Sequence, residues 1–215
     1  MVKILVDQKE IQTEQATNLL KACLEAGIYI PHLCYHEKMD DPPASCRMCF
    51  VDIEGEAQPV PSCTVRVREG MVVRTDTPAV RSLQRTALRL LLSVHVVDCA
   101  ACPANKKCEL QRMARLLKVG LKPKRLDQFL KETGPEQDHP VLEYHANRCV
   151  LCGKCVFLCH SLHGRPFLTF AKRGFDTVIS FYGEREKSLK ACDNCLACVE
   201  ICPVAAILSK RGTQT

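Results

Sequence analysis

The chain contains the run Cys149-Val-Leu-Cys152-Gly-Lys-Cys155-Val-Phe-Leu-Cys159 and, further on, the run Cys192-Asp-Asn-Cys195-Leu-Ala-Cys198-Val-Glu-Ile-Cys202-Pro203. Both runs have the spacing C-x2-C-x2-C-x3-C, which is typical of paired [4Fe–4S] sites. Chance does not readily place eight cysteines in such a double register. The two runs therefore predict two iron–sulfur clusters in one folding unit.

The spacing also predicts crossed ligation. In bacterial ferredoxins with this spacing, each run gives three thiolates to one cluster and its fourth thiolate to the other. One predicted ligand set is Cys149, Cys152, Cys155 and Cys202, and the other is Cys192, Cys195, Cys198 and Cys159. A pair of zinc sites is the alternative, because zinc also uses C-x2-C pairs. It is the weaker interpretation, since each run offers only three close ligands.

Composition narrows the class of protein further. The chain has 215 residues, 16 cysteines and no tryptophan. Its start, Met1 to Asp7, lacks the apolar stretch of a signal peptide, and its cysteines lie in metal-type clusters and not in dispersed pairs. We therefore expect a reducing, cytoplasmic location. No apolar run approaches the roughly 18–20 residues of a membrane span, so we expect no direct membrane insertion.

Residues 1–78 are predicted to form a small β-rich domain. We expect a strand pair at Lys3–Asp7 and Ile11–Glu14, with a turn at Gln8-Lys9. A further strand is expected to start in the stretch Cys46–Ile53, and two more are expected at Val60–Val67 and Met71–Arg74. Asn18–Ala26 has the apolar spacing of a helix that Gly27 ends. Cys23 lies on the apolar face of this helix and outside every cluster motif, so we expect a small core residue.

Four further cysteines of this domain are candidate ligands, namely Cys34, Cys46, Cys49 and Cys63. Four thiolates on loops around a small sheet suit a [2Fe–2S] cluster. Their spacing, C-x11-C-x2-C-x13-C, departs from the plant-type C-x4-C-x2-C pattern. The spacing alone therefore leaves a zinc site open.

The residues around these cysteines carry a family resemblance. Pro31-His-Leu-Cys34-Tyr, Ser45-Cys46-Arg-Met-Cys49 and Pro61-Ser-Cys63 closely resemble motifs of three families. These are the N-terminal domain of the largest peripheral subunit of respiratory complex I, the diaphorase iron–sulfur subunit of NAD-reducing [NiFe] hydrogenases, and the N-terminal part of [FeFe] hydrogenases. The resemblance implies a [2Fe–2S] cluster in a β-grasp ferredoxin fold.

A helix is predicted at Pro78–Val94, with arginines on one face and an apolar stripe on another. The arginines are Arg81, Arg85 and Arg89, and the stripe is Val80, Leu83, Ala87, Leu90, Leu91 and Val94. A solvated face is the simpler interpretation of the arginines. Docking to an acidic partner, or screening of a nearby cluster, is the functional alternative.

The pattern H-x3-C-x2-C-x5-C follows this helix, at His95, Cys99, Cys102 and Cys108. A lone histidine near a helix end is usually a surface or capping residue. The same pattern occurs in the three families named above, where it binds a [4Fe–4S] cluster through three cysteines and the histidine. The resemblance implies that ligation here, within a small helical domain of residues 79–140. That domain also contains a predicted helix at Glu109–Val119 and a connecting loop up to residue 140.

Residues 141–215 are predicted to form the two-cluster ferredoxin domain. Between its cysteine runs, Phe167–Arg173 and Phe175–Phe181 predict a β-hairpin that turns near Gly174. The resembling families carry a similar insertion with an Arg-Gly turn. The predicted fold class is thus α+β, with three domains at residues 1–78, 79–140 and 141–215.

The formal charge of +6 does not indicate a nucleic-acid partner. If 15 thiolates bind one [2Fe–2S] and three [4Fe–4S] cores, the clusters together carry roughly −7. The basic excess then compensates buried anionic clusters. We expect no nucleic acid among the partners.

The sequence contains neither a G-x-G-x-x-G nor a G-x4-G-K-S/T run, so we expect no nucleotide site in this chain. No catalytic residues are predicted. The resemblance implies an electron-transfer subunit, which relays single electrons through one [2Fe–2S] and three [4Fe–4S] clusters. Its implied partners are a flavin-containing, NAD(P)H-oxidising subunit and the small subunit of a cytoplasmic [NiFe] hydrogenase.

Other interpretations remain open. The chain could be the N-terminal cluster region, or a subunit, of an [FeFe] hydrogenase, an NAD-linked formate dehydrogenase, an electron-bifurcating complex or a complex I-like enzyme. A zinc-binding structural protein is a further alternative.

Overall fold

The computed structural model describes residues 1–122, 126–132, 139–165, 167–182 and 191–211. The chain divides into two compact units. Unit 1 is Met1–Leu90 with Met113–Val119, and unit 2 is Leu91–Arg112 with Gly120–Thr215.

Unit 1 is built on a five-stranded mixed sheet with the order β2-β1-β5-β3-β4. The strands are β1 (Val2–Val6), β2 (Lys9–Thr13), β3 (Phe50–Ile53), β4 (Val60–Pro61) and β5 (Val72–Arg74). β1 pairs in parallel with β5, and the other pairs are antiparallel. Helix α1 (Leu19–Glu25) packs on this sheet. A mixed sheet with a helix across one face is the predicted β-grasp arrangement, and the predicted α+β class is confirmed.

The first hairpin shows how local sequence sets this sheet. Val2, Ile4 and Val6 of β1 are buried, while the residues between them are exposed. Asp7 and Gln8 have φ values of 47° and 68°, and two consecutive positive φ angles belong to a tight turn that matches the twist of antiparallel strands. The turn therefore lies one residue earlier than predicted.

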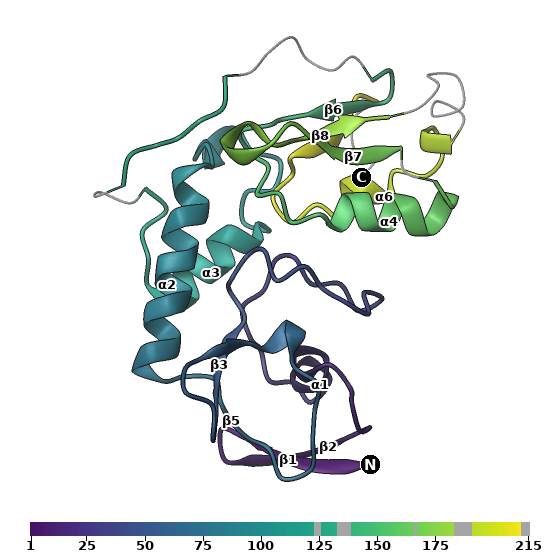
Figure 1. Ribbon diagram of the computed structural model, residues 1–215. Coiled ribbons are helices and arrows are strands. Elements are labelled where there is room, and N and C mark those ends of the chain that lie inside the picture. Colours follow the sequence, from purple (N-terminus) through teal and green to yellow (C-terminus); the bar gives the residue numbers. More distant parts are fainter. Residues whose placement is uncertain (123–125, 133–138, 166, 183–190, 212–215) are drawn as a thin grey trace. The chain divides into compact units, whose positions relative to one another are not determined.

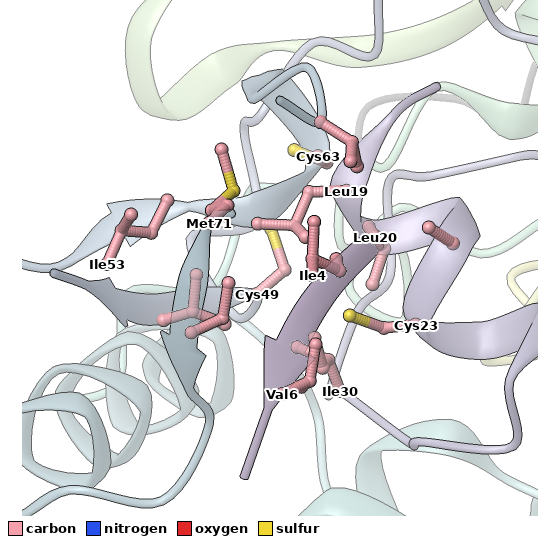
Figure 2. Close-up of a cluster of buried hydrophobic side chains, with 14 of the residues drawn as sticks. Ile4, Val6, Leu19, Leu20, Cys23, Ile30, Cys49, Ile53, Cys63 and Met71 are labelled. Atoms are coloured by element: carbon pink, nitrogen blue, oxygen red, sulfur yellow. The ribbon is translucent and has the colours of Figure 1, made fainter. Parts of the chain in front are cut away.

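The core of unit 1 lies between α1 and the sheet. In Figure 2, Leu19, Leu20 and Cys23 of α1 approach Ile4 and Val6 of β1. Cys23 is 0% exposed, and burial raises the pKa of its thiol to about 12. The prediction that Cys23 is a core residue is confirmed.

Two predicted strands of unit 1 are partly wrong, and both errors concern cysteine segments. The strand expected from Cys46 begins only at Phe50, and the strand expected at Val60–Val67 ends at Pro61. Ser62–Thr64 form a 3-10 turn that contains Cys63. Proline has no N–H for a strand ladder, and the Ser62 N–H and hydroxyl both donate to the Cys49 carbonyl, each at 2.9 Å. The cysteines therefore lie on loops and turns.

Helices α2 (Pro78–Ser93) and α3 (Glu109–Leu117) lie close to their predicted positions. The predicted apolar stripe of α2 is wrong at Leu83 and Leu90, which are 38% and 56% exposed. Gln84 is fully buried instead, because its amide donates to the Phe50 carbonyl.

Two of the three arginines of α2 have specific partners. Arg81 forms an ion pair with Asp76. Arg85 donates from Nε to the Leu117 carbonyl at 3.0 Å, which ties α2 to α3. These two arginines therefore make specific contacts within unit 1 and do not simply extend into solvent.

The described part of unit 2 includes two small antiparallel sheets and the helices α4 and α6 (Figure 1). β6 (Leu142–Tyr144) pairs with β9 (Ile207–Ser209), and β7 (Leu168–Ala171) pairs with β8 (Val178–Phe181). Helices α4 (Lys154–His163) and α6 (Ala197–Glu200) contact each other. The predicted hairpin is confirmed as β7–β8, with shorter strands and a 3-10 turn at Gly174–Asp176.

The two cysteine runs adopt the same backbone turn before these helices. Gly153 and Leu196 occupy equivalent positions and have φ values of 74° and 46°. A side chain at residue 153 would also meet the Phe170 ring, since an added Cβ would lie 3.3 Å from it. Glycine suits the first position for both reasons.

Residues 126–132 of the predicted connecting loop pack on other segments of unit 2. Phe129 N–H donates to the Ser93 carbonyl at 2.8 Å, and the Gln128 side chain donates to the His95 carbonyl at 3.3 Å. The Asn147 side chain bonds both the N–H and the carbonyl of Lys131. Residues 126–132 therefore pack on the segment that carries His95. Within the part of the chain that the structure describes, no helix is long and apolar enough to cross a membrane.

Candidate metal centres

Unit 1 brings together Cys34, Cys46, Cys49 and Cys63, none of which is more than 5% exposed. The sulfurs of Cys34 and Cys46 are 3.4 Å apart. A hydrogen bond with Cys46 lowers the pKa of Cys34, and one with Cys63 lowers the pKa of Cys49. The four thiols thus meet as two pairs. Two pairs suit a two-iron centre in which each iron takes two thiolates.

Side chains outside the cysteine motifs hold these loops in place. Asn18 donates from its amide to the Cys63 carbonyl, and its side-chain oxygen accepts from Lys21 N–H at 3.2 Å, which caps α1. The Ser62 hydroxyl donates a hydrogen bond to the Cys49 carbonyl at 2.9 Å. The backbone at Cys49 and Cys63 is therefore fixed by buried hydrogen bonds, which are costly to leave unmade.

A second candidate centre lies in unit 2 around His95. Cys99 begins a 3-10 turn, Cys102 follows it directly, and Cys108 lies just before α3. Burial raises the pKa of Cys108, and the nearby charges of Cys102 and Cys99 raise it further. These three cysteines are half-buried.

His95 is buried and is oriented by one hydrogen bond. Its Nδ1 lies 2.9 Å from the carbonyl oxygen of Arg148. A carbonyl can only accept, so Nδ1 carries the proton and Nε2 keeps its lone pair. Burial lowers the pKa of His95, which favours the neutral imidazole that binds metals. Histidine ligands usually donate their second N–H to a group of this kind.

The third candidate centre joins Cys202 to the first cysteine run. Cys149, Cys152 and Cys155 are buried. Burial raises the pKa of each, to about 12 for Cys152, and the charge of Cys202 raises all three further. Two sulfurs of this set also accept backbone N–H groups. Leu151 donates to Cys149 at 3.4 Å, and Ala206 donates to Cys202 at 3.1 Å.

The fourth candidate centre joins Cys159 to the second cysteine run. One cavity, of about 360 Å³ including space open to solvent, is lined by all four thiols of this predicted set. Burial raises the pKa of Cys198 to about 12, and the charges of Cys192, Cys159 and Cys195 raise it further. The remaining lining is apolar apart from His163; its residues are Leu142, Phe167, Leu168, Phe181, Leu196 and Ala197.

Across the described residues, no three histidine, cysteine or carboxylate side chains converge closely enough to bind a single metal ion. In a cubane each thiolate binds a different iron, so the ligands of one cluster need not meet at one point. The donor sets have the chemistry of iron–sulfur ligands, because they consist of thiolates and one neutral imidazole.

Three residues near these centres were not singled out from the sequence. Arg148 and Asp98 form an ion pair at 2.6 Å, and Tyr144 hydrogen-bonds the Cys149 thiol. Arg148 and Asp98 each directly precede a predicted ligand, which is the one signal that could have drawn attention to them. Nothing in the sequence marks Tyr144, whose role depends on the pairing of β6.

Comparison with known families divides the chain into three matches. Residues 1–78 match the family described as a 2Fe-2S iron-sulfur cluster binding domain. Residues 84–121 match the NADH-ubiquinone oxidoreductase-G iron-sulfur binding region. Residues 139–208 match the NADH-quinone oxidoreductase subunit 3, ferredoxin-like domain.

Curated relatives match nearly the whole chain. An NADH-quinone oxidoreductase subunit of Rhizobium meliloti (strain 1021) is 36% identical over 209 residues, which are 97% of this chain and 24% of that protein. The mitochondrial NADH-ubiquinone oxidoreductase 78 kDa subunit of Neurospora crassa is 32% identical over 211 residues, 97% of this chain and 28% of that protein. The chain thus spans about a quarter of the length of these relatives.

A solved structure resembles the whole chain. It is the crystal structure of NAD+-reducing [NiFe]-hydrogenase in the H2-reduced state, of which one chain is 29% identical to this one with a TM-score of 0.84. The similarity covers 100% of this chain and 90% of that chain. These matches agree with two of the three families that the cysteine motifs resemble, those of complex I and of NAD-reducing [NiFe] hydrogenases.

Proposed function

We propose that this chain relays single electrons through one [2Fe–2S] and three [4Fe–4S] clusters. It is an iron–sulfur electron-transfer protein related to subunits of NADH-quinone oxidoreductase and to a chain of NAD+-reducing [NiFe]-hydrogenase. The proposed domains are residues 1–78, 79–140 and 141–215. The bound clusters would supply one-electron carriers whose potentials depend on ligand type, hydrogen bonds to sulfur and burial.

The proposed ligands are the four candidate sets. They are Cys34, Cys46, Cys49 and Cys63 for the [2Fe–2S] cluster, and His95, Cys99, Cys102 and Cys108, then Cys149, Cys152, Cys155 and Cys202, then Cys192, Cys195, Cys198 and Cys159 for the [4Fe–4S] clusters. The observation that carries the proposal is the cavity that Cys159 shares with the three thiols of the second run. Crossed ligation needs this exchange of the fourth cysteine between the runs.

Other residues of the chain bury the proposed ligands and donate hydrogen bonds to them. Burial removes the thiols of unit 1 from water, and backbone N–H groups point at the sulfurs of Cys149 and Cys202. Such donors stabilise negative charge on the sulfurs. His95 offers a neutral ligand in place of a fourth thiolate.

The proposed partners are a flavin-containing, NAD(P)H-oxidising subunit and a hydrogenase small subunit, in a cytoplasmic complex where substrates bind to other chains. The solved relative supports this choice, because it comes from a NAD+-reducing [NiFe]-hydrogenase. A complex I-like enzyme is the second candidate, which the 36% identity to an NADH-quinone oxidoreductase subunit supports. Affinity purification of the tagged chain from its native source tests both, through the flavin and hydrogenase or quinone-reductase polypeptides that copurify.

Metal analysis tests the cluster content. Anaerobically purified protein should be brown and contain about 14 iron atoms per chain. A colourless protein that holds only zinc contradicts the proposal.

Two alanine variants test the crossed ligation. Cys159→Ala should abolish the EPR signal of the centre formed by the second run and spare that of the first run, whereas Cys202→Ala should do the opposite. Cys23→Ala is the matched control, because Cys23 is buried in the core of unit 1 and belongs to no ligand set. If each variant instead damages the centre of its own run, the ligation is not crossed.

A further inference from the structure

A short bonded route joins His95 to Cys149. The Nδ1 of His95 donates to the Arg148 carbonyl, and the carbon of that carbonyl is bonded to the backbone nitrogen of Cys149. His95 is a candidate ligand of one centre and Cys149 of another. One hydrogen bond and a few covalent bonds therefore connect two candidate centres, and electron tunnelling decays less steeply along such bonds than across space.

The peptide that makes this connection is held by its neighbours. Arg148 N–H donates to the His145 carbonyl at 3.0 Å, and Val96 N–H donates to the Asn147 carbonyl at 2.7 Å. These bonds align the segment before Cys149 with the segment that follows His95. Neither bond reaches the part of the segment after His95 that leads to Cys99.

The side chain of Arg148 supplies that third contact. Its guanidinium lies 2.6 Å from Oδ2 of Asp98, and the two side chains are only 11% and 37% exposed. Asp98 directly precedes Cys99. The ion pair therefore spans the two segments that carry ligands of different centres, with Arg148 largely buried and Asp98 partly exposed.

We propose that Arg148 is a positioning residue, whose ion pair with Asp98 holds its own carbonyl against His95, orients the imidazole for iron and keeps the bonded route to Cys149 intact. The inference rests on the proposed function, because it needs iron at His95. It goes beyond that function in assigning a role to an arginine that is not a ligand.

The test uses the complete complex that contains this chain, with Arg148→Met as the main variant. Methionine keeps the length of the side chain and removes the ion pair. Pulsed EPR of the His95 centre should show a changed 14N coupling, because the coupling depends on the orientation of the imidazole. Chelators should remove iron from this centre faster by about tenfold or more, as expected when an outer partner of a histidine ligand is lost.

Three further variants separate positioning from general damage. Asp98→Asn removes the same ion pair from the other side and should change the 14N coupling in the same direction. Arg148→Lys keeps the charge and should restore part of the iron retention. Arg68→Met is the control, since the ion pair of Arg68 with Glu56 is exposed and belongs to unit 1.

Selective change at the His95 centre supports the proposal. A wild-type 14N coupling and wild-type iron retention in Arg148→Met overturn it. Loss of every cluster signal, including that of the Cys34–Cys63 centre, also overturns it, because Arg148 would then serve folding as a whole. If the unaltered complex shows no 14N-coupled cluster, the proposed function itself fails.

Discussion

Tyr144 is a single side chain, outside every cysteine motif, that reaches a candidate ligand. Its hydroxyl oxygen accepts from Ile179 N–H at 3.1 Å. Its O–H lowers the pKa of the Cys149 thiol, against the larger effect of burial, which raises it. Burial raises the pKa of Tyr144 as well, so the phenol remains a donor. A donor at a ligand sulfur stabilises the reduced, more negative centre.

Replacing Tyr144 by phenylalanine removes this donor and also the acceptor of the Ile179 N–H. We expect Tyr144→Phe to lower the reduction potential of the Cys149–Cys202 centre by roughly a few tens of millivolts. One net hydrogen bond is worth about 1 kcal/mol, and a tenfold change in a one-electron equilibrium corresponds to about 59 mV. Redox titration monitored by EPR measures the shift. Tyr182→Phe, at a tyrosine that is 65% exposed, should leave the potential unchanged, and a rise in Tyr144→Phe contradicts the expected role.

His95 allows a test of ligand charge at one position. A neutral imidazole leaves a cluster less negative than a thiolate does, which favours reduction, as in Rieske centres. We expect His95→Cys to lower the potential of its centre in the same titration. A potential that stays the same or rises would argue that the histidine is not a ligand.

At the scale of elements, Asn18 couples helix α1 to the turn that carries Cys63. Its side-chain oxygen caps the helix, and its amide nitrogen donates to the Cys63 carbonyl. Asn18 is itself buried. One residue thus stabilises a helix start and fixes the backbone of a candidate ligand.

Two substitutions separate these roles. Asn18→Ala removes both, and we expect it to destabilise α1 by about 1–3 kcal/mol, from a lost cap and a lost buried hydrogen bond. Asn18→Asp keeps the cap but cannot donate to the Cys63 carbonyl, so we expect it to retain most of the protection of α1 while it loosens the Cys63 turn. Native-state hydrogen exchange measures both segments. Equal effects of the two variants on α1 would show that the cap contributes little.

At the scale of the whole molecule, both units bury candidate ligand thiols beside apolar side chains. Unit 1 has a continuous apolar core that includes Ile4, Leu19, Leu20 and Val73. In unit 2, the buried residues include Cys149, Cys152, Cys155 and Cys159. When iron binds such thiols, part of the binding free energy is folding free energy.

Iron removal should therefore affect the units unequally. We expect the iron-free chain to keep hydrogen-exchange protection in β1 and β2 of unit 1, and to lose it in β6 to β9 and α4 of unit 2. Reconstitution with iron and sulfide should restore the protection of unit 2. Equal loss in both units would mean that the apolar core of unit 1 does not suffice without its cluster.

Much of the fold follows from local patterns, and the errors have physical causes. The alternation of Val2, Ile4 and Val6 predicts β1, because strand side chains point to opposite faces in turn. The periodicity of α2 predicts a helix, but it does not reveal that Gln84 finds a buried carbonyl while Leu83 stays exposed. Pro61 ends β4 where a longer strand was expected. Contacts between distant segments decided each of these points.

By itself, the sequence determined the two ferredoxin-type ligand sets, because cluster chemistry imposes the spacing of cysteines along the chain. For the sets around Cys34 and His95, the sequence pointed to the ligands through its resemblance to known families. Only the tertiary structure decided what surrounds them. The partner of the His95 imidazole lies 53 residues away, and that of the Cys63 carbonyl lies 45 residues away. Short motifs encode ligands because neighbouring residues share one metal centre. Long-range hydrogen bonds carry no such local signal, since any residue with a suitable donor can supply them once the fold brings it near.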